Sequence, residues 1–304
     1  MELIKDNYLY GTGHGDTWSV NIDPPKRKVR TYYEETVEAV EYVHANKTGK
    51  FQVLYSGGLD SQYVCEVLLR LGMDFDPVVI ELHGEDGIYN EHDIKYAYDF
   101  CESHNLKPIR YDLDFDHFYK SGKIVEIAEA TTCCTLAIPA TMHVISQLDG
   151  FTLMGNDPPY LRFDNKRGWL LEEMEYIHSL LRFYDKFQMN GCPFLLSYTP
   201  EMMLSFLIDP AIYNLGTGSY PGKTGSNSTK SMVFNNGSDF NIPSYDFVSK
   251  TRIKYNGYEN IFRTERMNHP NLKIFEEFQK QWNGEYLEPY LDAVNRLSIN
   301  QHRA

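Results

Sequence analysis

The sequence predicts an α/β fold: a Rossmann-like parallel sheet with helices on both faces, followed by a mostly helical C-terminal extension. The evidence is an alternation of short apolar segments, which favour buried strands, with segments whose apolar residues recur at helical spacing. The predicted strands cover residues 51–55, 77–82, 108–113 and 151–154. Because crossovers between parallel strands are right-handed, the carboxyl ends of these strands should lie along one edge of the sheet, where ligands bind in such folds.

Helices are expected between and around these strands. An amphipathic helix over residues 33–46 precedes the first strand, and a helical pattern over 91–105 separates the second strand from the third. Residues 117–148 should be helical in two pieces, because Pro139 and two threonines interrupt the pattern. Residues 170–190 also have a helical pattern.

The composition is that of a globular protein. Of the 304 residues 42% are hydrophobic, and no apolar run is long enough to cross a membrane. A formal net charge of −13 makes a general nucleic-acid binder unlikely, since a phosphate backbone requires a basic surface. The five cysteines lack paired CxxC spacing, as expected in a reducing compartment. Because the first residues have no signal-peptide character, we expect a cytoplasmic protein.

A glycine-rich loop, Ser56-Gly57-Gly58-Leu59-Asp60-Ser61, joins the first predicted strand to an amphipathic helix. The first amides of a helix lack intrahelical partners and carry a partial positive charge, so an anion is favoured there. The two glycines lack the Cβ that would keep an anion away from the backbone, and the two serines add hydroxyl donors. The 56–61 loop is therefore predicted to bind a phosphate group.

The loop sequence Ser-Gly-Gly-Leu-Asp-Ser resembles the pyrophosphate-binding loop of the PP-loop ATP pyrophosphatases. This superfamily includes the synthetase domain of asparagine synthetase, 7-cyano-7-deazaguanine synthase and tRNA-thiolating enzymes. The resemblance covers residues 51 to about 157. It implies a PP-loop-type fold that uses ATP and Mg²⁺, with the 56–61 loop on the pyrophosphate and Asp60 in a catalytic role.

The resemblance also implies further site residues. Residues that end the second strand, among them Glu81 and Leu82, would border the adenosine. The segment Gly155-Asn156-Asp157 would face the 56–61 loop, with Gly155 and Asn156 near the nucleotide. Asp157 and Asp60 would then hold the magnesium ion, which takes few protein ligands.

The last third of the chain offers cations for the phosphates. Residues 216–238 are rich in small polar residues and have the length of a lid, in which Lys223 and Lys230 could reach a phosphate on closure, although surface lysines are the default. The segment 248–267 concentrates basic residues. Since PP-loop relatives use late-chain lysines against ATP phosphates, Lys250 and Lys254 are catalytic candidates.

These observations predict an N-terminal arm and helix (1–48), a PP-loop ATP-binding domain (49–190) and a C-terminal helical lid and substrate region (191–304). The first expectation for the reaction is an asparagine-synthetase-like ligase that adenylates a substrate oxygen, releases pyrophosphate and transfers a nitrogen nucleophile to a small molecule. Its ammonia would come from solution or from a separate glutaminase. The alternatives are sulfur transfer through Cys133 or Cys134, as in RNA thiolation or sulfonucleotide reduction, and nucleotide binding without catalysis.

Overall fold

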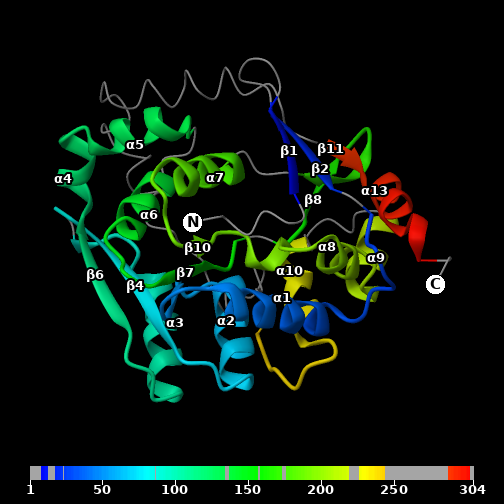
Figure 1. Ribbon diagram of the computed structural model, residues 1–304, viewed down its shortest axis with the longest axis horizontal. Coiled ribbons are helices and arrows are strands. Elements are labelled where there is room, and N and C mark those ends of the chain that lie inside the picture. The colour runs from blue at the N-terminus through cyan, green and yellow to red at the C-terminus, as the bar shows by residue number, and fades with distance from the viewer. Residues whose placement is uncertain are drawn as a thin grey trace.

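The structure of the protein is a computed structural model, and it describes residues 8–12, 18–22, 24–85, 87–133, 137–156, 158–172, 176–218, 226–243 and 287–301. Its centre is a mainly parallel sheet covered by helices on both faces (Figure 1), as the alternating pattern predicts. The strands of this sheet lie in the order β10–β7–β3–β4–β6. Their bounds are Phe51–Leu54 (β3), Phe75–Gly84 (β4), Ile109–Asp114 (β6), Phe151–Met154 (β7) and Gly191–Cys192 (β10).

The short strand β5 (Gly87–Ile88) folds back antiparallel on the end of β4. It lies beyond the point where β3 stops, because β3 pairs with β4 through Val78, whereas β5 pairs with His83 and Gly84. On the other edge of β4, β6 pairs in parallel from Val78 to His83. The last residues of β4 therefore extend past β3.

One face of the sheet is covered by α1 (Tyr32–Asn46), α2 (Leu59–Arg70) and α3 (Glu91–Ser103), which lie together below the sheet in Figure 1. The predicted helix 33–46 is α1, one residue longer at its start. Thr31 and Glu34 form a capping box, in which each side chain binds the other residue's backbone amide. The threonine thus satisfies an amide that has no partner inside the helix, which fixes where α1 begins.

The opposite face carries a second group of helices: α4 (Phe115–Lys120), α5 (Lys123–Thr131), α6 (Ala137–Ile145) and α7 (Tyr176–Lys186). The prediction of two helical pieces over 117–148 is wrong, because this region contains the three helices α4, α5 and α6. The additional break lies at Ser121-Gly122, where Gly122 has a φ of 82°. The strand residues alternate between the two faces. Val53 and Val79 pack toward the first group of helices, whereas Leu54 and Val78 pack toward the second.

The rest of the described chain adds an antiparallel sheet to the predicted helices. It is formed by β8 (Tyr160–Asp164), β9 (Gly168–Glu172) and β11 (Leu287–Pro289), so the helix predicted over 170–190 begins too early. An N-terminal hairpin consists of β1 (Tyr8–Thr12) and β2 (Trp18–Ile22). The remaining helices are α8 (Pro200–Leu207), α9 (Pro210–Thr217), α10 (Ser226–Asn235) and α13 (Tyr290–Leu297), with 3₁₀ turns at Leu195–Ser197 and Ser298–Asn300.

Helix α10 packs directly on α2. The ring of Phe234 stacks on that of Tyr63, with centroids 4.3 Å apart and planes 8° apart, and it also contacts Tyr32 of α1. The hydroxyl of Tyr63 donates to Thr36. All these side chains are buried, so residues distant in sequence share one hydrophobic cluster.

We predict that Phe234→Ala lowers the free energy of unfolding by about 3–5 kcal/mol, since it empties the centre of this aromatic cluster. Met232→Ala on the same helix is the matched control. Its side chain is 58% exposed, and the change should stay within about 0.5 kcal/mol. Urea unfolding followed by circular dichroism measures both variants. Equal losses in the two would show that α10 does not depend on this stack.

Candidate functional site

The 56–61 loop connects β3 to α2, as the sequence predicts. The backbone amide of Tyr55 donates to Val78 O over 2.8 Å, which keeps the chain on the sheet as the loop begins. Gly57 has a φ of +80°, in the left-handed region, and Gly58 occupies the N-cap position of α2. The loop therefore delivers the first amides of α2 to the carboxyl edge of the sheet.

Hydroxyl groups line the inside of this turn. The Ser61 hydroxyl donates to Gly58 O over 3.1 Å, and the Gly58 amide donates to Ser56 Oγ over 3.3 Å. The hydroxyl oxygens of Ser56 and Ser61 are 3.5 Å apart. A single bound oxyanion can reach both serines at this separation.

Close packing explains both glycines that face other segments. A Cβ on Gly57 would lie 1.9 Å from the carbonyl oxygen of Asp93 in α3, and a Cβ on Gly155 would lie 2.8 Å from the backbone of Asp60. The 56–61 loop is thus held between the start of α3 and the segment after β7. Residues at these two positions need to be glycine because any side chain would separate the three segments.

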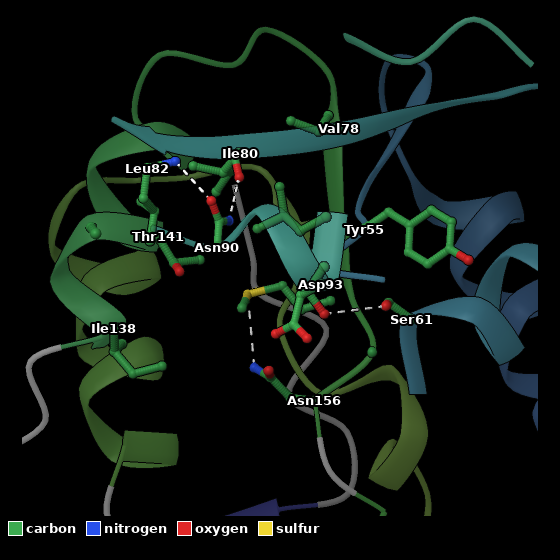
Figure 2. Close-up of a pocket in the computed structure, with 15 residues that line it drawn as sticks. Tyr55, Ser61, Val78, Ile80, Leu82, Asn90, Asp93, Ile138, Thr141 and Asn156 are labelled. Atoms are coloured by element: carbon green, nitrogen blue, oxygen red, sulfur yellow. Dashed lines mark hydrogen bonds between the residues drawn. The ribbon is translucent and has the colours of Figure 1, made fainter. Parts of the chain in front are cut away.

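A cavity of about 230 Å³ opens beside the loop (Figure 2). Part of its wall is apolar and comes from the carboxyl ends of the strands and from α6. Another part is polar and comes from the loop and its surroundings. The apolar wall consists of Leu54, Val78, Ile80, Leu82, Ile138, Ala140 and Met154. The other lining residues are Tyr55, Ser56, Ser61, Asn90, Asp93, Thr141, Gly155 and Asn156.

Several predicted residues meet at this cavity. Ser56, Ser61, Leu82, Gly155 and Asn156 line it. The Asn156 side chain is held by hydrogen bonds from its amide to Pro193 O, at 3.0 Å, and to the sulfur of Met154, at 3.8 Å. The loop after β7 therefore faces the 56–61 loop, as the resemblance implies.

Glu81 does not line the cavity with its side chain. Successive residues of a strand point to opposite faces, so Glu81 points away from the side occupied by Ile80 and Leu82. Its buried carboxylate accepts from the Tyr98 hydroxyl at 2.6 Å and pairs with Arg110 at 2.9 Å. Burial and this hydrogen bond raise the pKa of Tyr98. The structure therefore places the Glu81 side chain away from the cavity, and of the two predicted residues Glu81 and Leu82 only Leu82 lines it.

Glu81, His83 and Asp112 have ligand atoms within 4.8 Å of one another. Arg110 already supplies positive charge to this cluster, since it pairs with Glu81 and, at 2.6 Å, with Asp112. A metal ion would have to displace the guanidinium. The cluster is therefore an ion-pair network at the ends of β4 and β6.

Asp60 pairs with a lysine from the C-terminal region. Lys230 Nζ lies 3.0 Å from Asp60 Oδ2, and the lysine side chain is 4% exposed. The default expectation of a surface lysine is wrong for Lys230. The stacking of Phe234 explains its position, because residues four apart lie on the same side of a helix.

Among the cavity residues with polar side chains that were not predicted from the sequence are Asn90 and Asp93. Asp93, in the first turn of α3, is 6% exposed, and Asn90 precedes α3. In the sequence, Asn-Glu-His-Asp at 90–93 is indistinguishable from an ordinary acidic helix start. The contact of Asp93 O with Gly57 is what brings this turn to the site.

Other predicted site residues lie outside the described part of the chain. They are Asp157, Lys250 and Lys254, and the same holds for Lys223 and Cys134. Among the described cysteines, Cys133 is fully buried. Burial raises the pKa of Cys101 to about 11 and that of Cys192 to about 12, so these thiols are poorly ionised at neutral pH.

Within the ranges given above, no helix has both the length and the apolar character needed to cross a bilayer.

Comparisons with known proteins give limited similarity. No protein-family model matches the chain, and no curated protein matches it. Similar solved structures include a predicted subunit of tRNA methyltransferase from Methanocaldococcus jannaschii, with 13% identity, a TM-score of 0.31, and coverage of 51% of this chain and 72% of that one. The U34-tRNA thiolase NcsA from Methanococcus maripaludis has 12% identity and a TM-score of 0.31, and the match covers 82% of this chain and 78% of that one.

NMN synthetase from Francisella tularensis has 9% identity and a TM-score of 0.26, covering 90% of this chain and 92% of that one. TM-scores this low describe loose superpositions. They support no assignment of function to this chain.

We predict that Gly57→Ala destabilises the protein more than Gly72→Ala. Both glycines have positive φ and flank α2, so each substitution carries a backbone cost of roughly 1–2 kcal/mol. A Cβ at Gly72 meets open space, whereas at Gly57 it meets Asp93 O. Urea unfolding of the two variants isolates the effect of that contact. Equal destabilisation would mean that the loop and α3 move apart without cost.

Proposed function

We propose that this protein is an ATP-using enzyme that cleaves ATP between the α and β phosphates and joins a nitrogen nucleophile to a small-molecule substrate, as asparagine-synthetase-like ligases do. The observation that carries the proposal is the cavity at the 56–61 loop. An apolar wall next to a hydroxyl-lined loop and a helix start matches a nucleotide, whose base is flat and largely apolar and whose phosphates are anionic.

The residues of the loop have distinct roles in this reaction. A substrate oxygen attacks the α-phosphorus and forms a bond to it, while the bond to the bridging oxygen breaks and pyrophosphate leaves with its electron pair. The hydroxyls of Ser56 and Ser61 and the first amides of α2 donate to the departing oxygens, where negative charge develops. The adenylated substrate then releases AMP when the nitrogen nucleophile attacks it.

Lys230 offsets the negative charge of Asp60 at the loop. A carboxylate in the first turn of α2, such as Asp60, repels an incoming phosphate, and the Lys230 ammonium 3.0 Å away offsets that charge. Because the two charges cancel, the phosphates would lie near a neutral Asp60–Lys230 pair rather than near an unpaired carboxylate. We assign Lys230 the cationic role for which Lys250 and Lys254 were the sequence candidates.

Magnesium fits the donor set around the loop. The cavity residue Asp93 supplies carboxylate oxygens, and Asp60 would share its carboxylate between the ion and the Lys230 ammonium 3.0 Å away. Mg²⁺ usually takes one or two carboxylates together with phosphate oxygens and water. When bound, the ion would neutralise charge on the pyrophosphate. Asp157 remains a candidate ligand, and the ammonia source, whether free or supplied by a glutaminase partner, belongs to the same proposal.

The alternative of sulfur transfer requires a reactive thiol near the cavity. The described cysteines are buried, and none of them lines the described cavity wall. Nitrogen transfer needs no protein thiol. Cys134, the other candidate thiol, lies outside the described residues, so sulfur transfer stays the second candidate reaction beside amide formation.

We predict that the wild-type protein binds MgATP and releases pyrophosphate when the correct acceptor is supplied. ATP binding is measured by calorimetry, and pyrophosphate release is measured with pooled amino acids and ammonia. Lys230→Met should lower pyrophosphate release on the order of 10²-fold, the loss typical for one group that stabilises transition-state charge. The matched control is Lys123→Met, which removes a lysine from an exposed ion pair and should have no effect.

Three outcomes separate the hypotheses. Pyrophosphate release that depends on Lys230 supports α–β cleavage. ATP binding without pyrophosphate release from any acceptor pool supports a nucleotide-binding protein. Absence of ATP binding would overturn the assignment of the cavity itself.

A further inference from the structure

The edge of β4 that faces the cavity has a short gap in its hydrogen bonding. At one end of the gap, Tyr55 N donates to Val78 O over 2.8 Å, and at the other, Tyr89 N donates to Leu82 O over 2.8 Å. Between these points lie the carbonyl of Ile80 and the amide of Leu82. No strand pairs with these two groups among the described residues, since β3 has ended and β5 begins opposite His83.

The side chain of Asn90 fills this gap. Its Nδ2 donates to Ile80 O over 2.8 Å, and its Oδ1 accepts from Leu82 N over 3.0 Å, as the dashed lines of Figure 2 show. One amide side chain thus takes the place of a neighbouring strand. Backbone groups in such a position are costly to leave without partners, so the gap requires some occupant.

Asn90 stands at the N-cap position of α3, where an asparagine side chain normally accepts a hydrogen bond from an amide of the first turn. Here it makes no such bond. Its side chain is turned toward β4 instead. The Asn90 backbone has φ −106° and ψ 24°, outside the extended region typical of a capping residue, and its carbonyl already accepts from the Asp93 amide over 3.1 Å. The side chain therefore serves β4 rather than the helix start.

The gap also opens into the cavity. Asn90, Ile80 and Leu82 all line it, together with the apolar side chains of Val78 and Met154. An adenine has apolar faces that suit this wall. Its polar edge carries an acceptor, N1, beside a donor, the N6 amino group, which is the same pair that the Asn90 amide presents to β4.

We propose that Asn90 is a replaceable cover for this strand edge and thereby sets the affinity for the base. Without nucleotide, Asn90 binds Ile80 and Leu82. When ATP enters, adenine N1 accepts from Leu82 N and N6 donates to Ile80 O, while the Asn90 side chain rotates away from β4. This inference rests on the proposed function, because it assumes that the cavity takes an adenine nucleotide.

The cover lowers the apparent affinity for ATP, because the binding-competent arrangement is a fraction of the population. Asn90→Ala should therefore bind ATP more tightly. The gain is on the order of tenfold if the arrangement with Asn90 on β4 is about ten times as populated as the open one. Inorganic tripolyphosphate, which has no base, should bind the variant and the wild type equally. Glu91→Ala, an exposed neighbour in the first turn of α3, is the matched control and should change neither affinity.

The affinities are measured by calorimetry on the full chain, with hydrogen exchange as an independent readout. In the free wild type the Leu82 amide should be protected by Asn90, and in free Asn90→Ala it should exchange faster. ATP should restore its protection in the variant, whereas tripolyphosphate should not. Asn90→Ser, which retains the N-cap preference but is too short to bridge both β4 groups, replaces the alanine variant if that variant does not fold.

The results distinguish this inference from the function on which it rests. If neither the wild type nor the variant binds ATP, the proposed function fails and this inference fails with it. If both proteins bind ATP but the variant binds it no more tightly than the wild type, the proposed role of Asn90 is wrong while the ATP site stands. The same conclusion follows if ATP does not protect the Leu82 amide of the variant. Tighter ATP binding with unchanged tripolyphosphate binding and restored protection supports the cover.

Discussion

The constraint on which the site depends is the close approach of three backbones at the 56–61 loop. The loop, the first turn of α3 and the segment after β7 meet where Gly57 and Gly155 leave no room for a Cβ. This contact places the helix start of α2, the serine hydroxyls and Asn156 around one cavity. Packing of backbone against backbone leaves few alternative positions for these groups, which is how a loop gains the precision that charge stabilisation requires.

Electrostatics adds a second requirement at this point. The protein is acidic overall, with a formal net charge of −13, yet its candidate phosphate site contains a buried lysine. Positive potential there comes from the helix start and the hydroxyls, while the Lys230 ammonium offsets the charge of Asp60. In the proposed function these few placed groups bind the phosphates of a nucleotide, and the acidic balance of the whole chain disfavours a nucleic-acid backbone.

Much of the parallel sheet could be predicted from sequence, because strand β3 and helices α1 and α2 have local signals. A buried apolar run, a capping box and a glycine-rich loop are each determined by residues close in sequence. The orientation of Glu81 could also have been predicted, since strand alternation puts it opposite Leu82. The roles of Lys230 and Asp93 could not, because their positions depend on the stack of Phe234 on Tyr63 and on the contact of Asp93 with Gly57.

The parallel course of α2 and α10 has a consequence for the order of folding. The contacts Asp60–Lys230 and Tyr63–Phe234 advance in the same direction along both helices, and each joins residues about 170 positions apart. Contacts this distant close a long loop, so their formation carries an entropy cost that contacts local in sequence avoid. During synthesis the sheet and the 56–61 loop emerge well before α10. In the proposed function, the nascent chain therefore holds the 56–61 loop before Lys230 can offset the charge of Asp60, and the anion site is completed when α10 docks on α2.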